Sequence, residues 1–241
     1  MKIKVLSWNI WGGYFVDLPG VISLLKKENA DIVALQEVKS NGENQGKIIA
    51  KELGINFYDF RVFTTDRHDP SFSLGNSLLS KSEFVSTESI FLSDISDYQK
   101  DWETEPRGLV KAEINPGGDN LTVSNVHLAY SKDFAPSGMR TKQVKNLMNS
   151  VDPIRSILIG DFNSLPDSPE IKFIQTKFEN SDPNLNKKTW RVRDKEDPDR
   201  KLKPKHRIDY VFVSPDIKVI DFRVLGDYSS DHFPITATLE V

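Results

Sequence analysis

The chain has 241 residues, of which 38% are hydrophobic and 28% are charged, and its mean hydropathy is −0.43. A chain of this length can bury a sizeable core, and the composition is that of an ordinary globular protein. Cysteine is absent, which excludes disulfides, thiolate metal sites and a cysteine nucleophile, and the net charge of −3 argues against general binding of polyanions.

The spacing of apolar residues predicts many short strands and few helices. In chain order, strands are expected at 2–8, 31–38, 56–63, 74–80, 84–91, 107–114, 120–128, 155–160, 207–214, 217–225 and 233–240. Helices are expected at 18–30, 44–54, 137–150 and 168–178, whereas 93–106 has no clear pattern. Interleaved strands with few helices favour two packed sheets with helices outside. No linker divides the chain, so we expect a single domain over residues 1–241.

Segments that would direct the chain to a membrane are not evident in the sequence. No apolar run approaches the roughly 18 residues that a membrane-spanning helix needs. The apolar stretch near the start is too short for the core of a signal peptide. We therefore expect the protein in the cytoplasm, unless a leader has been removed. Separately, we expect it to be a monomer.

Many of the predicted strands end on a polar side chain. For several of these residues a purely structural interpretation is open. Asn9 and Asn76 can be turn residues, and Glu37 can be a surface carboxylate. His127 on an apolar strand can be a buried core histidine. Asp209 is harder to explain in this way, because it lies within an apolar strand, where an unpaired carboxylate is costly.

One of these strands runs directly into the sequence GDFN at residues 160–163. Because side chains alternate along a strand, Asp161 and Asn163 are expected on one side and Phe162 on the other. A simple turn is the alternative interpretation, since Asp, Asn and Ser commonly follow strands.

If the polar strand ends meet, several carboxylates share one cleft. They are Glu37, Asp161, Asp209 and Asp231. Two like charges 4 Å apart repel by about 4 kcal/mol at an effective dielectric constant of 20, so such a group needs a cation. Oxygen ligands suit Mg²⁺ or Mn²⁺ better than zinc. A divalent ion beside a histidine points to phosphoester chemistry, in which the imidazole takes a proton from water.

Seven motifs in this order connect the chain with a known family. They are LSWN, LQEV, GNSLLS, NVHL, GDFN, RIDYVF and SDHFP. In this order they resemble the endonuclease/exonuclease/phosphatase superfamily, from residue 5 to about residue 235. The resemblance implies an α/β protein with the deoxyribonuclease-like four-layer fold. In that fold, two mixed β-sheets pack as a sandwich flanked by helices, and the site lies at one edge.

The resemblance also implies a role for each polar strand end. Asn9, Glu37 and Asp231 would hold Mg²⁺, for which Mn²⁺ can substitute. Asp209 would orient His232, which would either activate the attacking water or contact the phosphate.

Further roles implied by the resemblance concern the nucleophile and the leaving group. Asp161 and Asn163 would position the nucleophile and the phosphorus, with a second metal as an additional role. His127 would act on the leaving-group side. Whether Asp161 or His232 is the base stays open. Two supporting residues would face the phosphate, Asn76 and Arg107.

The segment 187–207 bears on the substrate. It carries ten Lys or Arg and four Asp or Glu, a net charge of +6, and it contains Trp190. A basic segment with an aromatic ring suits a nucleic-acid backbone and its bases. The alternative is a solvated loop whose charges pair internally.

Three functions therefore remain under consideration. The first is a Mg²⁺-dependent phosphodiesterase or nuclease acting on nucleic acid. The second is a hydrolase of a smaller phosphoester, such as a phospholipid head group or a sugar or nucleotide phosphate. The third is an inactive binding module.

Overall fold

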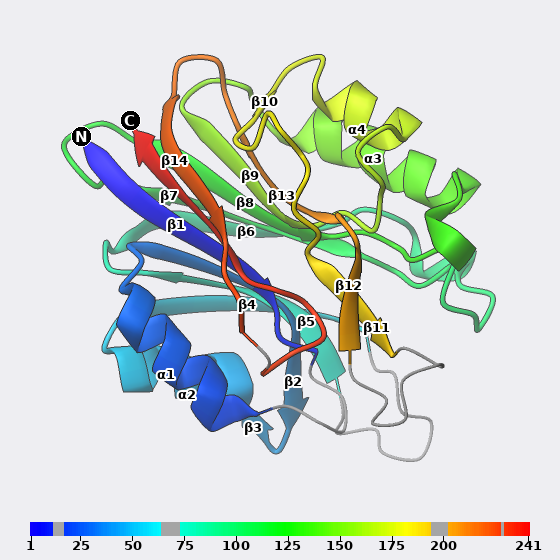
Figure 1. The fold of residues 1–241 in the computed structure, drawn as a ribbon, viewed down its shortest axis with the longest axis horizontal. Coiled ribbons are helices and arrows are strands. Elements are labelled where there is room, and N and C mark those ends of the chain that lie inside the picture. Colours follow the sequence, from blue (N-terminus) through cyan, green and yellow to red (C-terminus); the bar gives the residue numbers. More distant parts are fainter. Residues whose placement is uncertain (12–16, 64–72, 194–201, 228) are drawn as a thin grey trace.

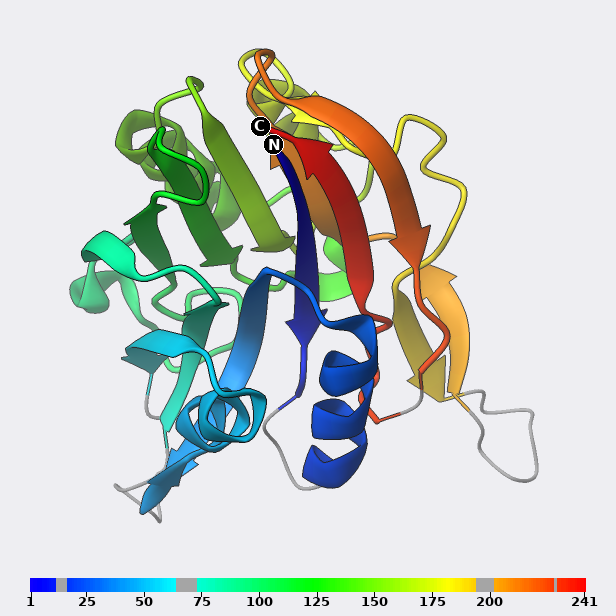
Figure 2. The ribbon, with the colours of Figure 1, turned by 90° about the vertical axis from the view of Figure 1, so that its left-hand side faces the viewer.

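The computed structural model describes residues 1–241 except 12–16, 64–72, 194–201 and 228 (Figure 1). Two mixed sheets pack face to face, and helices cover the outer face of each sheet (Figures 1 and 2). This arrangement confirms the predicted sandwich. Within the described residues, no helix combines the length and the apolar character that crossing a membrane requires.

The first sheet contains strands from both ends of the chain. They are β1 (Lys2–Asn9), β2 (Ile32–Asn41), β3 (Glu43–Asn44), β4 (Asn56–Phe63), β5 (Ser73–Ser80), β14 (Lys218–Val224) and β15 (Ile235–Glu240). Their order is β14-β15-β1-β2-β5-β4, with β3 paired to β2. The two chain ends lie side by side, and the amide of Val241 donates to the carbonyl of Met1 at 2.8 Å (Figures 1 and 2).

The second sheet is built from the middle of the chain. It contains β6 (Phe84–Phe91), β7 (Gly108–Ile114), β8 (Leu121–His127), β9 (Ser156–Asp161), β10 (Glu179–Asn180) and β13 (Asp209–Val213), in the order β10-β13-β9-β8-β7-β6. A separate hairpin is formed by β11 (Trp190–Arg193) and β12 (Leu202–His206).

In the part of the chain that the structure describes, four helices and an apolar layer complete the sandwich. Helices α1 (Leu18–Glu28) and α2 (Gln45–Leu53) pack on the first sheet, and α3 (Gly138–Ser150) and α4 (Pro169–Ile174) pack on the second. Short 3-10 turns lie at Ile95–Asp97 and Lys132–Phe134. Between the sheets lies a third apolar cluster, to which β1, β2, β8, β9 and β13 all contribute.

Each sheet contains one parallel strand pair with a helix as its crossover. The pairs are β1-α1-β2 and β8-α3-β9. Parallel strands run in the same direction, so their carboxyl ends lie at the same edge of a sheet. The register pairs Asn9 with Gln36 and His127 with Asp161. This topology therefore brings the polar strand ends of each half together.

Three differences between the observed and the predicted elements bear on the site or its surroundings. β2 continues past Glu37 to Asn41, and α4 ends at Ile174, short of residue 178. The segment 187–207 is not simply a loop, since it contains β11 and β12. Their highly charged sequence hides the apolar alternation by which a strand is recognised. Lys195, Arg200 and Lys201 of this segment lie outside the described residues.

The close approach of β8 and β9 requires a glycine at position 160. Gly160 has φ +146°, and an added Cβ would overlap the carbonyl oxygen of Val126. We expect Gly160→Ala to lower the free energy of unfolding by about 2 kcal/mol or more, because the backbone must move where two strands meet. Chemical denaturation measures this loss. The matched control is Gly138→Ala, where no atom lies within 4 Å of the added Cβ. Equal losses in both variants would contradict the interpretation.

Candidate active site

A row of three buried side chains crosses the second sheet at the edge where β8 and β9 end. The register pairs Asp209 with Asp161, and Asp161 with His127. Residues paired directly across neighbouring strands point to the same side of a sheet. Here that side is the one facing the first sheet, because Ile157 and Ile159 of β9 belong to the core between the sheets. The row thus lies on the same side of the sheet as the apolar core, at the edge where the core ends.

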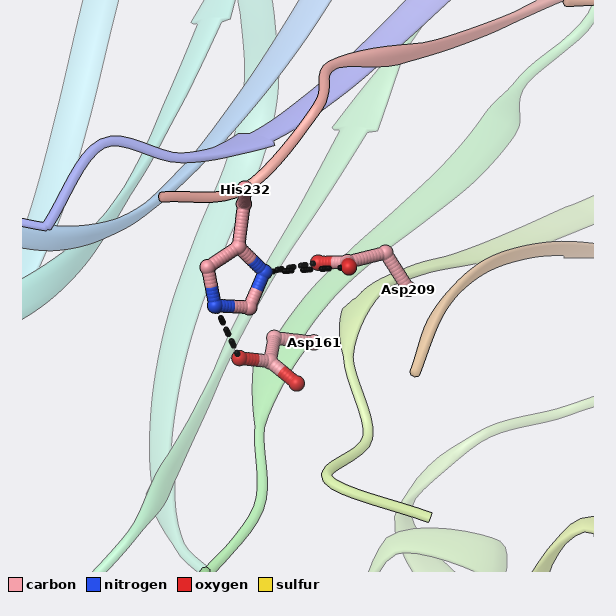
Figure 3. A group of neighbouring side chains, drawn as sticks. All are labelled: Asp161, Asp209 and His232. Atoms are coloured by element: carbon pink, nitrogen blue, oxygen red, sulfur yellow. Dashed lines mark hydrogen bonds and ion pairs between the residues drawn. The ribbon is translucent and has the colours of Figure 1, made fainter. Parts of the chain in front are cut away.

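His232 lies against this row and is held by Asp209 (Figure 3). Its Nδ1 is 3.1 and 3.0 Å from the two carboxylate oxygens of Asp209, and its Nε2 is 3.8 Å from Oδ2 of Asp161. Burial disfavours the imidazolium, but the carboxylates of Asp209, Asp231 and Asp161 outweigh this effect and raise the pKa of His232 to about 10. Asp209, which looked anomalous within an apolar strand, is therefore paired with a cation.

Asp161 is a buried carboxylate among other charges. Burial, and after it the negative charge of Asp209, raises the pKa of Asp161 to about 7. Its Oδ1 accepts a hydrogen bond from the Asn163 backbone amide at 2.9 Å. The expected alternation is observed, since Phe162 packs into the core beneath α3 and α4. The aromatic ring therefore fixes the end of β9 while Asp161 faces the site.

Asn9 joins the two sheets at this edge. Its amide nitrogen donates to Oε1 of Glu37 at 3.1 Å and to Oδ2 of Asp161 at 3.0 Å. Its Oδ1 accepts from the backbone amide of Trp11 at 2.9 Å. Burial, and after it the charge of Asp231, raises the pKa of Glu37. The carboxylates of Glu37 and Asp161 are therefore linked through Asn9, and Asp231 lies near Glu37.

A β-bulge gives Glu37 its position. Val33 and Leu35 point to the helix-covered face of the first sheet, and regular alternation would send Glu37 there as well. Instead, the register with β5 shifts between Leu35 and Val38, and Val38 takes the place on that face. Glu37 has φ +53°, a rare conformation for a residue other than glycine. The bulge re-aims its carboxylate towards the site.

Two buried amides support the bulge, and sequence reasoning assigned neither to the site. Asn125 of β8 donates across the sandwich to the carbonyls of Leu35 at 2.9 Å and Ser77 at 2.8 Å. Gln36 donates to Oδ1 of Asn125 at 2.7 Å. Each of these contacts joins strands that are far apart in the chain. The only sequence signal for such residues is that predicted strands finish on polar side chains. Asn125 is one of the polar residues near the end of β8.

His127 lies beside Asp161 and is surrounded by further polar groups. Its Nε2 is 3.5 Å from Oδ2 of Asp161 and 3.1 Å from Nδ2 of Asn163. Its Nδ1 is 3.2 Å from Nη1 of Arg107. The other terminal nitrogen of Arg107, Nη2, donates to the carboxylate of Glu105 at 2.6 Å. Burial, and after it the charges of Arg107 and His232, lowers the pKa of His127 well below its usual range. Sequence reasoning missed Glu105, which lies in the segment without a clear pattern.

The remaining predicted residues lie around the same edge. Asn76 donates to the carbonyl of Gly108 at 2.9 Å and lines a small hollow together with Glu37, Arg107 and His127. Trp190 donates from Nε1 to Oδ2 of Asp231 at 3.3 Å. The structure thus brings all the predicted site residues to one edge: Asn9, Glu37, Asn76, Arg107, His127, Asp161, Asn163, Trp190, Asp209, Asp231 and His232.

The donor groups fit a hard divalent cation. Asp161, Asp209 and His232 have ligand atoms within 4.8 Å of one another, but both oxygens of Asp209 already contact His232. The carboxylates of Glu37 and Asp231, with Asp161 beside them, form a set of oxygen ligands that Mg²⁺ and Mn²⁺ prefer. The raised pKa values of Glu37 and Asp161 reflect burial first, and then the negative charges of Asp231 and Asp209, respectively. A bound cation would offset this repulsion.

Comparisons with known proteins support the fold described above. The family model described as Endonuclease/Exonuclease/phosphatase family matches residues 6–232. No curated protein sequence matches the chain. Among solved structures, an endonuclease/exonuclease/phosphatase from Beutenbergia cavernae is 22% identical with a TM-score of 0.82, covering 100% of this chain and 72% of that one.

Two further solved structures have the same fold and different names. A mannosyl-6-phosphatase from Bacteroides thetaiotaomicron is 18% identical with a TM-score of 0.74, covering 99% of this chain and 100% of that one. D. rerio TDP2, complexed with single-strand DNA product, is 20% identical with a TM-score of 0.73, covering 100% of this chain and 99% of that one.

The pairing of His232 with Asp209 predicts how this histidine titrates. In EDTA we expect His232 to titrate near pH 10, as its pKa is raised to about 10. The stability that the pair contributes should be present in full below the unfolded value of about 6.5 and be lost as the pH rises to about 10. Asp209→Asn should return the pKa of His232 towards the unfolded value. Histidine NMR measures the titration of His232 in the wild-type protein and in the variant.

The matched control is Asp152→Asn, an exposed carboxylate before the start of β9, at the end opposite the site. It should leave the titration of His232 unchanged. An unshifted titration in Asp209→Asn would show that the carboxylate does not hold the proton on His232.

Proposed function

Since the chain belongs to the endonuclease/exonuclease/phosphatase family, we propose that it is a phosphodiesterase that hydrolyses nucleic-acid phosphodiester bonds with the help of Mg²⁺ or Mn²⁺. The observation that carries this proposal is the His232–Asp209 pair facing Asp161 at the edge where Glu37 and Asp231 gather. That arrangement combines groups that move protons with groups that bind a cation.

Glu37 and Asp231 would hold the metal ion, together with Asp161 and with the side-chain oxygens of Asn9 and Asn163. A divalent ion bound there supplies positive charge that offsets the negative charge developing on the phosphoryl oxygens. The other steps fall to the side chains of the row and to His232.

In this proposal the oxygen of a water molecule bonds to phosphorus while the bond to the leaving oxygen breaks. Asp161, whose pKa is about 7, is suited to accept the proton of that water. His232 carries its proton at neutral pH, because its pKa is about 10, and is suited to donate to a phosphoryl oxygen. Asp209 keeps Nδ1 of the imidazole in place, so Nε2 points towards Asp161. We therefore assign the role of base to Asp161 and that of proton donor to His232.

In this proposal, His127 acts on the side of the phosphate where the leaving group departs. His127 and Asn163 lie next to Asp161, and Arg107 stands behind the imidazole. A neutral imidazole and a guanidinium can both donate hydrogen bonds to a leaving phosphate ester oxygen. Asn76 and Arg107 line the same hollow and would contact the bound ester.

A smaller phosphoester is the second candidate substrate. The structural neighbours include a protein named as a mannosyl-6-phosphatase as well as one complexed with a single-strand DNA product. The basic hairpin β11–β12 beside Asp231 favours nucleic acid. An inactive binding module is the least supported alternative, because every predicted catalytic position carries a side chain able to perform its role.

The enzyme hypothesis predicts metal-dependent turnover. Plasmid DNA, abasic duplex, RNA, bis-p-nitrophenyl phosphate, p-nitrophenyl phosphate and phospholipids would each be assayed with Mg²⁺, Mn²⁺ or EDTA. We expect cleavage of diesters that EDTA abolishes. His232→Ala and Asp161→Ala should each reduce kcat by about 10²-fold or more. The control Asp221→Asn, an exposed carboxylate on β14, should retain full activity. Absence of turnover on every ester would favour the binding-module hypothesis.

The choice of nucleic acid as substrate predicts a steep dependence on salt. Neutralising Lys203 and Lys205 of β12 should flatten the plot of log(kcat/KM) against log[salt] by about one unit for each phosphate that a lysine no longer neutralises. Lys201, which the sequence also suggests, lies outside the described residues. Lys47→Gln on α2 is the control and should leave the slope unchanged. If DNA cleavage by the Lys203 and Lys205 variants keeps the same salt slope, a smaller phosphoester becomes the better candidate.

A further inference from the structure

An aromatic cluster stands beside the candidate active site. The ring of Phe134 is at its centre, with ring centroids 5.5 Å from Tyr130, 5.1 Å from Trp190 and 5.1 Å from His206. Trp190 and His206 are stacked, with an interplanar angle of 18°. Phe134 is 3% exposed, whereas the three rings around it are half-buried. The half-buried rings therefore rest on a buried phenyl base and keep part of their surface in solvent.

The cluster continues into a hollow of about 720 Å³. Its lining includes Tyr130, Lys100, Lys132 and Trp102. Trp102 is 73% exposed, although its large apolar ring would gain from burial. We call the five rings together the aromatic surface: Trp102, Tyr130, Phe134, Trp190 and His206.

The backbone beneath these rings is held in a costly conformation. Asp133 and Phe134 both have positive φ, +53° and +57°, which few residues other than glycine adopt. The fully buried guanidinium of Arg140 donates to Oγ of Ser131 at 2.7 Å and to the carbonyl of Ala135 at 2.6 Å, and so ties down both sides of this turn. Strained backbone that is fixed in this way concentrates at ligand-binding sites. The aromatic surface is thus preorganised.

The aromatic surface is continuous with the candidate active site. Trp190 donates to the carboxylate of Asp231 at 3.3 Å and forms a backbone bridge with His232. A substrate strand whose phosphate lies at His232 would therefore pass next to Trp190. From there, Phe134 links Trp190 to Tyr130, which lines the hollow with Trp102.

Lysines around the aromatic surface can pair with the phosphates of an anionic ligand. Four exposed lysines surround it: Lys100, Lys132, Lys188 and Lys205. Acids also lie nearby, among them Asp101, Glu103 and Asp133, and the first two accept hydrogen bonds from neutral groups. Asp101 accepts from the backbone amide and the hydroxyl of Thr104, each at 2.8 Å, and Glu103 accepts from the backbone amide of Lys132 at 2.9 Å.

We propose that the aromatic surface binds single-stranded nucleic acid, whose bases stack on Trp102, Tyr130 and Trp190 while the lysines pair with its phosphates. Stacking on side chains requires bases that are not already stacked in a duplex, so a single strand is favoured. The inference deepens the proposed nuclease function and rests on it. It specifies that the nucleotides next to the scissile phosphate are unpaired.

Binding of a fluorescein-labelled single-stranded oligothymidylate of ten nucleotides, followed by anisotropy in EDTA, tests the proposal without turnover. We expect Trp102→Ala and Tyr130→Ala each to raise Kd by about 10-fold, within the range that base stacking on an aromatic ring contributes. Trp102→Phe keeps an aromatic ring and should restore most of the binding. A duplex of equal length should bind wild-type protein more weakly than the single strand.

The control is Phe173→Ala, another exposed aromatic, which lies on α4 and should leave Kd unchanged. Because Trp102 is 73% exposed, its replacement should also leave the melting temperature unchanged, which separates a binding defect from misfolding. Equal Kd values for wild type and Trp102→Ala, or tighter binding of the duplex or of anionic phospholipid vesicles than of the single strand, would overturn the proposal.

Hydrolysis of bis-p-nitrophenyl phosphate by the wild-type protein keeps this test separate from the test of the proposed function. Metal-dependent hydrolysis of this ester, together with a Kd for the oligonucleotide that does not depend on Trp102, would leave the phosphodiesterase in place and remove the aromatic surface as its binding site. Binding that depends on Trp102 supports the aromatic surface, whatever the rate on the small ester.

Discussion

The mutual repulsion of carboxylates buried at one edge is the constraint on which the candidate site depends. The charge of Asp231 raises the pKa of Glu37, and the charge of Asp209 raises that of Asp161. The carboxylates of Asp209, Asp231 and Asp161 together raise the pKa of His232. The fold holds this charge with the imidazolium of His232 and with the amide of Asn9, which donates to two of the carboxylates. Both groups come from the first sheet or from the loop before its strand β15, whereas Asp161 and Asp209 come from the second. The same charges that oppose folding of the edge would be offset by a bound divalent cation.

Hydrogen bonds between the sheets keep the two halves of the edge in register. Asn125 crosses the apolar core to reach the carbonyls of Leu35 and Ser77, where the bulge interrupts the pairing of β2 with β5. Unpaired carbonyls buried there would be costly. One amide therefore stabilises the bulge and fixes the distance between the strand that carries Glu37 and the strand that carries His127. Precise placement of a site at the junction of two sheets needs such a link, because apolar packing alone is not directional.

The strands and most residues of the candidate site could be predicted from the sequence, because they follow from the local apolar pattern and from residue type. Apolar alternation located the main strands, and the polar groups that ended them proved to meet at one edge, as His127 and Asp161 illustrate. The bulge at Glu37 could not be predicted, because nothing in the letters LQEV distinguishes it from a regular strand. The roles of Gln36 and Asn125 were hidden for a similar reason, since their partners lie 48 to 90 residues away in the chain. The hairpin β11–β12 is held by contacts of Trp190 with His206 and His232, which no local pattern reveals.

The adjacent chain ends have a practical meaning for this fold. β1 and β15 are neighbours inside the first sheet, and the ends meet at the start of β1, whereas Asn9 lies at its other end. A strand of eight residues rises by roughly 26 Å, so peptide attached to either terminus emerges far from the candidate active site. The two termini could also be joined by a few glycines and the chain reopened in a surface turn. Such a circular permutant would keep every strand neighbour and change only the order in which the strands are synthesised.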